Sequence, residues 1–184
     1  MVIKMGSFKD KVVVVTGAGG GLGKAHAIEF AKRGAKVVVN DLGGSDDGRG
    51  KSDMADLVVD EIRSFGGEAI ANKASVADKK GAQSIVDDAV NTYGTLDILV
   101  NNAGILRDKS FKNMDMGDWD IVMNVHLNGT SYVTKAAWDI MWRKTYGRIL
   151  FTSSTSGIFG NFGQANYGAA KMGMLGLMNV LAIE

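Results

Sequence analysis

A chain of 184 residues with 46% apolar residues is long enough for one domain with a single buried core. Its 21 basic and 20 acidic residues leave a formal charge of +1, which favours neither nucleic acid nor an anionic membrane as a partner. The sequence has no cysteine, only two histidines, and no apolar run near the about 18 residues that span a bilayer. These absences argue against disulfides, metal sites and membrane insertion, and fit a soluble intracellular protein.

Apolar segments rich in valine and isoleucine alternate with longer segments of helical period. Strands are expected at 11–17, 35–41, 67–75, 96–104 and 147–154, and helices at 21–33, 52–64, 78–93, 116–141 and from about 164 onward. Because most of these strands are apolar on successive residues, both of their faces should be covered.

Five strand-then-helix units predict an α/β fold with a doubly wound, Rossmann-like parallel sheet in the order 3-2-1-4-5. A helical bundle is the alternative. It would require the valine runs at 12–15 and 37–39 to be helical against the preference of β-branched residues. No proline-rich linker divides the chain, so one domain is expected.

A glycine-rich turn, TGAGGGLG, lies between the first predicted strand and the first helix. Gly17, Gly21 and Gly23, with Leu22 between the last two, would let the backbone approach a pyrophosphate closely at a helix N-terminus. A plain turn is the alternative interpretation. The position of the glycines favours a dinucleotide site, and no GKS or GKT follows that would indicate a nucleoside triphosphate loop.

The second predicted strand ends at Asp41, about 20 residues after the turn, where dinucleotide sites place an acid on the adenosine ribose. A carboxylate there would repel a 2′-phosphate, so NAD is favoured over NADP. Lys24 or Arg49 could shift that balance. Alternatively, Asp41 is only a turn residue that opens the next glycine-rich loop.

In YGAAK, the i,i+4 spacing places Tyr167 and Lys171 on one helix face. An ammonium beside a phenol favours the phenolate, which can accept a proton from a substrate hydroxyl while hydride moves to a cofactor. The hydroxyl of Ser154, after the fifth strand, could hold the same substrate oxygen. Taken alone, a tyrosine and a lysine on one exposed helix face would carry no chemistry.

Together, TGAGGGLG, NNAG at 101–104 and YGAAK resemble the motifs of the short-chain dehydrogenase/reductase superfamily over nearly the whole chain. Within it, LDILVNNAGILRDKSF and YGRILFTSSTSGIFGNFGQANY are similar to the (3R)-hydroxyacyl-CoA dehydrogenases of β-oxidation. That resemblance implies NAD-dependent oxidation of (3R)-3-hydroxyacyl-CoA to 3-ketoacyl-CoA, a peroxisomal location and a homodimer.

The resemblance also implies roles for single residues. Tyr167 would be the base, Lys171 would assist it and bind the nicotinamide ribose, and Ser154, rather than Ser153, has the family's spacing for orienting the substrate oxygen. The implied cofactor contacts are Gly17, Gly21, Leu22, Gly23, Asp41, Ser75, Val76, Asn101, Ala103, Gly104, Tyr167 and Lys171.

Two positions depart from the superfamily pattern. Ser75 and Val76 stand where an aspartate often contacts adenine, so a contact there should run through the Val76 backbone. His126 stands where the superfamily has a catalytic asparagine, and Asn124, two residues earlier, should point elsewhere on the helix. His126 therefore either replaces the asparagine in a proton relay or has a structural role.

The resemblance further implies a strand, a substrate-covering loop and a final strand beyond residue 184. Residues 1–184 are thus expected to form a single NAD-binding dehydrogenase domain that lacks these segments. Two alternatives stay open: a dinucleotide-binding or assembly fragment without turnover, and a dehydrogenase of steroids or other secondary alcohols.

Overall fold

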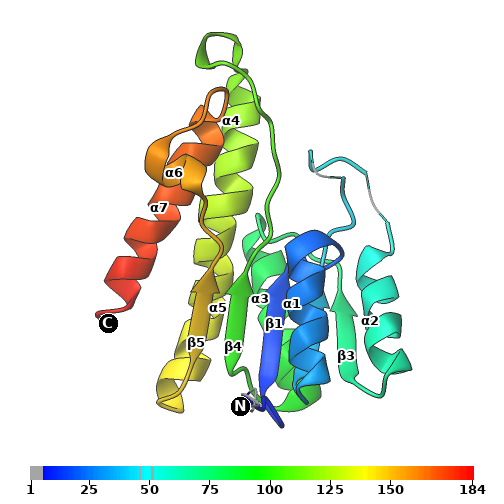
Figure 1. Cartoon of the computed structure of the whole chain (residues 1–184). Coiled ribbons are helices and arrows are strands. Elements are labelled where there is room, and N and C mark those ends of the chain that lie inside the picture. Colours follow the sequence, from blue (N-terminus) through cyan, green and yellow to red (C-terminus); the bar gives the residue numbers. More distant parts are fainter. Residues whose placement is uncertain (1–5, 46, 51) are drawn as a thin grey trace, which may run out of the picture.

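The computed structural model describes residues 6–45, 47–50 and 52–184. In chain order its elements are β1 (Val12–Thr16), α1 (Gly21–Lys32), β2 (Lys36–Asn40), α2 (Met54–Ser64), β3 (Glu68–Asn72), α3 (Lys79–Tyr93), β4 (Ile98–Asn101), η1 (Phe111–Asn113), α4 (Met116–Met123), η2 (Asn124–Asn128), α5 (Gly129–Arg143), β5 (Arg148–Phe151), α6 (Thr155–Phe159) and α7 (Ala165–Leu181). The five strands form one parallel sheet in the order β3-β2-β1-β4-β5, which confirms the predicted topology (Figure 1).

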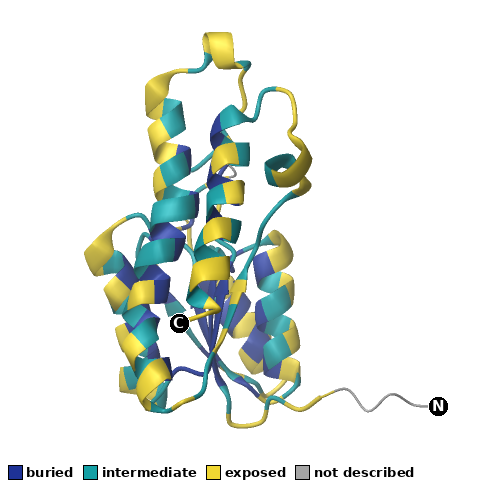
Figure 2. Ribbon diagram, turned by 90° about the vertical axis from the view of Figure 1, so that its left-hand side faces the viewer, coloured by how far each residue is buried: buried dark blue, intermediate teal, exposed yellow. Residues whose placement is uncertain are grey.

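Helices cover both faces of the sheet, because successive residues of its central strands point to opposite sides. Val13 and Val15 pack with α1 and α2 on one face. Val12 and Val14 pack with α3 and α5 on the other face. Figure 2 shows the buried residues gathered in the strands and along the helix faces turned toward them. Every helix within the described residues is too short or too polar to span a lipid bilayer.

The helical region predicted at 116–141 forms as three consecutive pieces, α4, η2 and α5, of which η2 is a π-helical turn. Two short elements were not predicted, the 3₁₀ turn η1 and the helix α6. A π-type turn shifts the following side chains around the helix axis and is often found at functional sites.

The carboxyl ends of the strands lie at one edge of the sheet because the pairing is parallel and in register. Thr16 at the end of β1 lies opposite Asn40 at the end of β2, and Val15 pairs with Val100 of β4. The segments that follow these three strands therefore start side by side, and they contain the glycine turn, Asp41 and NNAG.

The opposite edge of the sheet is fixed by Asp97, just before β4. One carboxylate oxygen accepts the N–H of Val12 at 2.9 Å, and the other accepts Lys144 Nζ at 2.6 Å. Burial raises the pKa of Asp97, but the hydrogen bonds from Lys144 and Val12 outweigh burial and hold the pKa below its usual value. Asp97 thus joins β1 and β4 to the connection between α5 and β5.

We expect Asp97→Asn to lower the free energy of unfolding at pH 7 by about 1–3 kcal/mol, because the amide cannot form the ion pair with Lys144. A lowered carboxyl pKa stabilises the folded state above the pKa of the unfolded chain, about 3.9, and this stability is lost as the pH falls toward the folded-state pKa. Urea unfolding at pH 7 and pH 3 should therefore show a difference that shrinks at pH 3. Asp139→Asn, at an exposed position of α5, is the matched control, and equal effects of the two substitutions at pH 7 would contradict this role.

Candidate active site

The turn after β1 needs glycine for steric reasons. Gly17 has φ +62°, and a Cβ on this residue would lie 2.7 Å from Ala103 Cα. A Cβ on Gly23 would collide with the Gly17 carbonyl oxygen. The N-cap of α1 is Gly20, so no side chain caps the amides of the first turn of the helix. A close backbone approach at an uncapped helix N-terminus suits a phosphate group.

The carboxylate of Asp41 links this turn to the loop after β2. One oxygen accepts the N–H of Gly19 at 2.8 Å, and the other accepts the N–H of Gly43 at 2.7 Å. The bond to Gly43 is the turn role considered for Asp41 from the sequence. Each carboxylate oxygen can accept a further hydrogen bond, so the ribose role is compatible with the turn role.

Thr16 and Asn102 join the ends of β1 and β4. The Thr16 hydroxyl accepts the N–H of Asn102 at 3.0 Å, and the Asn102 side chain donates to the carbonyl oxygen of Gly17 at 3.0 Å. The side chain of Asn101, expected beside a cofactor, instead donates to Thr134 of α5 at 3.0 Å and is buried. Asn102, which the sequence did not single out, is thus the side chain that faces the glycine turn.

The segment after β3 contains Val76, for which a backbone contact with a cofactor is predicted. Its side chain is buried, and a Cβ on Gly129 of α5 would lie 2.9 Å from Val76 Cγ2, so the side chain points into the core. The Val76 side chain is therefore turned away from a ligand, whereas Ser75 is only partly buried and its hydroxyl oxygen accepts the N–H of Ala77 at 3.2 Å. A buried bond of 2.9 Å between the side chains of Asn40 and Asn72 supports this edge of the sheet.

Tyr167 and Lys171 share one face of α7, as their spacing predicts. Lys171 is 3% exposed, its Nζ donates to the carbonyl oxygen of Thr152 at 2.5 Å, and Nζ lies 5.5 Å from the centroid of the Tyr167 ring. Burial lowers the pKa of Lys171 to about 8. The side chain is therefore a buried ammonium next to a phenol at neutral pH.

The two neighbouring serines have different environments. Ser153 donates its hydroxyl to the carbonyl oxygen of Lys171 at 3.2 Å. Ser154 is the N-cap of α6, and its hydroxyl oxygen accepts the N–H of Ser156 at 3.2 Å. The Ser154 hydroxyl hydrogen has no acceptor among the described residues, whereas the Ser153 hydroxyl supports the backbone of α7. The Ser154 hydroxyl is thus free to donate to a ligand, and its role in orienting a substrate stays a prediction.

His126 lies between NNAG and Tyr167. Its ring is 2% exposed and meets the Tyr167 ring edge-on, with centroids 5.1 Å apart. A Cβ on Gly104 would collide with the His126 ring. Nε2 of His126 lies 3.0 Å from the nitrogen and 2.9 Å from the oxygen of Ile105. Asn124 is exposed and accepts a hydrogen bond from Asn128, so it points elsewhere, as expected.

The electrostatics of His126 bear on both of its possible roles, the structural role and the proton relay. Burial, followed by the positive charge of Lys171, lowers the pKa of His126 to about 4, so the ring is neutral at pH 7. Nδ1 is buried without a hydrogen-bond partner among the described residues. The ring contacts support a structural role, and the unpartnered Nδ1 leaves a relay role open.

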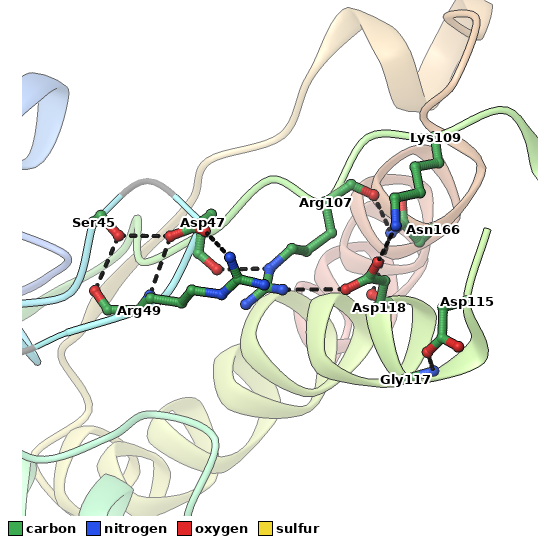
Figure 3. Close-up of polar contacts among 9 residues, drawn as sticks. All are labelled: Ser45, Asp47, Arg49, Arg107, Lys109, Asp115, Gly117, Asp118 and Asn166. Atoms are coloured by element: carbon green, nitrogen blue, oxygen red, sulfur yellow. Dashed lines mark hydrogen bonds and ion pairs between the residues drawn. The ribbon is translucent and has the colours of Figure 1, made fainter. Parts of the chain in front are cut away.

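Asn166, directly before Tyr167, is a positioning residue that the sequence analysis missed. It is fully buried, and its side-chain oxygen accepts the N–H of Tyr167 at 2.7 Å. Its side-chain nitrogen donates to the carbonyl oxygens of Arg107 at 3.1 Å and Asp118 at 3.2 Å (Figure 3). These bonds fix the first turn of α7 against the segment after β4 and against α4.

A hollow of about 1080 Å³ lies away from Ser154, Tyr167 and Lys171, and runs between α5, β5 and the end of α7. Its lining includes Trp138, Tyr146, Phe151, Met178 and Leu181. Within the described residues β5 pairs with β4 alone, so this hollow follows the free edge of the sheet.

Comparison with known proteins shows a match of residues 11–184 to the short chain dehydrogenase family model. The chain is 59% identical over 97% of its length to peroxisomal multifunctional enzyme A of Dictyostelium discoideum, and 60% identical over 96% of its length to peroxisomal multifunctional enzyme type 2 of Mus musculus. It spans 40% and 24% of the lengths of these two relatives. A crystal structure of a short chain dehydrogenase from Mycobacterium avium superposes with a TM-score of 0.88 at 46% identity, covering 97% of this chain and 64% of that one.

We expect Lys171→Met to raise the free energy of unfolding at pH 7 by about 1–3 kcal/mol, because it removes a buried ammonium at the expense of one hydrogen bond. The pKa of Lys171 is lowered from 10.5 to about 8, so the charge opposes folding fully below pH 8. This opposition disappears as the pH rises from about 8 to about 10.5.

The advantage of Lys171→Met should therefore shrink over that pH interval, as measured by urea unfolding at pH 7, 9 and 10.5. Lys135→Met, at an exposed position of α5, should show no such trend. A Lys171→Met variant that is less stable than wild type at every pH would contradict the charge argument.

Proposed function

The chain belongs to the short-chain dehydrogenase family and is therefore an oxidoreductase, and we propose that it oxidises (3R)-3-hydroxyacyl-CoA to 3-ketoacyl-CoA with NAD. The observation that carries this proposal is the buried Lys171 ammonium beside the Tyr167 ring. The substrate class comes from the family resemblance of the sequence, and the similarity to the two peroxisomal multifunctional enzymes supports it. Their names support a peroxisomal location for this protein. Because the chain spans less than half the length of either relative, the activity of these relatives is only proposed for this chain.

The residues after β1, β2 and β4 fit a dinucleotide. The proposed contacts are Gly17, Gly21, Leu22 and Gly23 at the pyrophosphate, Asp41 at the adenosine ribose, Ser75 and the Val76 backbone at adenine, and Asn101, Ala103, Gly104, Tyr167 and Lys171 toward the nicotinamide. For Asn101 this contact would have to be through the backbone, because its side chain bonds to Thr134. When bound, the nicotinamide supplies the acceptor for a hydride from the carbinol carbon.

In the proposed mechanism, Tyr167 takes the proton from the substrate hydroxyl while that carbon loses hydride. Ser154 donates a hydrogen bond to the same oxygen. Lys171 places a positive charge beside the phenol, with its Nζ 5.5 Å from the centroid of the Tyr167 ring. Since His126 is neutral at pH 7, it adds no second positive charge to the site. Lys171 is thus the dominant cation beside the phenol below pH 8.

A dinucleotide-binding fragment without turnover is the second candidate, and it is favoured by the position of the large hollow, whose lining lacks Ser154, Tyr167 and Lys171. We propose that residues 1–184 form a single NAD-binding dehydrogenase domain, as the family resemblance implies. The homodimer expected from the family resemblance remains a prediction.

Absorbance of NADH should rise when the protein is mixed with NAD and a (3R)-3-hydroxyacyl-CoA, and Tyr167→Phe should lower kcat by about 10²–10⁴-fold. The substitution removes the only ionisable group of this side chain. Tyr132→Phe, on α5, is the matched control and should retain the rate. The melting temperature of Tyr167→Phe should still rise with NAD by mass action.

Three other outcomes distinguish the alternatives. A wild-type chain that NAD stabilises but that turns over no substrate would support the binding fragment. Turnover of a steroid, but not of the hydroxyacyl-CoA, would support a dehydrogenase of steroids or other secondary alcohols. A fully active Tyr167→Phe variant would refute the mechanism.

Asp41→Ser should change the choice of cofactor. We expect wild type to bind NAD more tightly than NADP, and the variant to lose about tenfold or more of that preference, because it removes both a ribose acceptor and the repulsion of a 2′-phosphate. Titration calorimetry with both cofactors measures the ratio of dissociation constants. Asp60→Asn, at an exposed position of α2, is the control for charge, and a wild-type preference for NADP would contradict the role of Asp41.

A further inference from the structure

The loop after β2 folds back on itself as a compact turn. Ser45 N–H donates to the Arg49 carbonyl oxygen at 2.8 Å, and Gly48 N–H donates to the Ser45 carbonyl oxygen at 2.7 Å. The Ser45 hydroxyl bonds to the Asp47 carboxylate at 2.6 Å, and this bond is the main cause that lowers the pKa of Asp47. The described residues of this loop, 43–45 and 47–50, are called the strap below. Because these residues are bonded to one another, a single contact from another segment is enough to fix the position of the strap.

The strap reaches across the sheet to the segment after β4. Arg107 Nε donates to the Asp47 carbonyl oxygen at 2.7 Å (Figure 3). A Cβ on Gly48 would lie 3.1 Å from Ile105 Cγ2, so the strap also packs against this segment. Because β1 lies between β2 and β4 in the sheet, a contact between the loops after β2 and β4 must pass over the carboxyl end of β1. The glycine turn begins at that end, and Figure 1 shows the loop after β2 extending above it.

The guanidinium of Arg107 is itself held from the opposite side. Its Nη1 lies 3.2 Å from the Asp118 carboxylate of α4, and the two side chains are only 15% and 17% exposed. Asp118 is fixed in turn, because its carbonyl oxygen accepts the hydrogen bond from the buried Asn166 side chain. Arg107 thus spans two partners through separate nitrogens of its planar guanidinium fork, Nε to the Asp47 carbonyl oxygen and Nη1 to the Asp118 carboxylate, which a lysine cannot do with the same geometry.

Lys109 provides a natural comparison. Its Nζ lies 3.3 Å from the other Asp118 oxygen, but the lysine side chain is 54% exposed and has no hydrogen bond to the strap among the described residues. The two cations therefore share one carboxylate, and within the described part of the chain only Arg107 connects that carboxylate to the loop after β2.

We infer that Arg107 is a positioning residue that fastens the strap over the bound dinucleotide and so slows its release. The inference rests on the dinucleotide site proposed above. A ligand that extends from Asp41 over the glycine turn to Gly104 would lie between the sheet edge and the strap. It could leave only past the strap, or after the bond from Arg107 to Asp47 opens.

The test compares Arg107→Met with Lys109→Met, since both remove one positive charge from Asp118. Titration calorimetry should give a dissociation constant for NAD about tenfold or more higher for Arg107→Met, and stopped-flow displacement should place most of the change in the dissociation rate. Lys109→Met should stay within about twofold of wild type. Arg107→Lys, which keeps the charge but not the fork, should fall between them.

Further measurements separate this role from a general loss of structure. KM for NAD should rise while kcat at saturating NAD changes by less than about twofold. Hydrogen exchange of the Gly48 and Arg49 amides should be faster in Arg107→Met without any ligand. Gly48→Ala displaces the strap by another route, because Gly48 has φ +81° and faces Ile105. It should raise the same dissociation constant even if Arg107→Met does not fold.

Equal NAD affinities of Arg107→Met and Lys109→Met, or a wild-type affinity in Gly48→Ala, would overturn the inference and leave the NAD site intact. A wild-type chain that binds no NAD would overturn the proposed cofactor, and the inference with it.

Discussion

The parallel pairing of β1 with β2 and β4 is the constraint on which the candidate site depends. It brings the ends of three strands to one edge, so that the glycine turn, Asp41 and NNAG start side by side. The Thr16 hydroxyl and the Asn102 amide then bond the ends of β1 and β4 together. If this register slipped by one residue, alternate side chains would exchange faces, and Asn102 would lose the carbonyl oxygens of the turn.

The buried positive charge of Lys171 lowers the stability of the fold. Its ammonium is buried with the Thr152 carbonyl oxygen as its hydrogen-bond partner, and burial lowers its pKa toward the working range of the protein. The neighbouring His126 ring remains neutral. His126 is uncharged at pH 7 because burial and the positive charge of Lys171 both oppose its protonation. At pH 7 Tyr167 therefore has one charged neighbour, the Lys171 ammonium, and one uncharged neighbour, the His126 imidazole.

Most of the fold was predictable, because unbroken valine runs have few alternatives to buried parallel strands. The shared face of Tyr167 and Lys171 followed from helical spacing alone. Contacts fixed by tertiary packing were not predictable. The choice between Asn101 and Asn102 depends on which face of β4 each side chain meets, and a motif does not encode that. The π turn at His126, the short helix after Ser154 and the bonds of Asn166 likewise carry no period in the sequence.

The segment after β4 serves both halves of the candidate site through different atoms of one residue. The backbone carbonyl of Arg107 receives the Asn166 side chain, which holds the first turn of α7 at Tyr167. The guanidinium of Arg107 points the other way and holds the strap through the Asp47 carbonyl. Substituting the side chain removes the second contact and keeps the first, because the carbonyl belongs to the backbone. The contact that holds the strap and the contact that supports the first turn of α7 therefore share one segment, yet a substitution of the Arg107 side chain separates them.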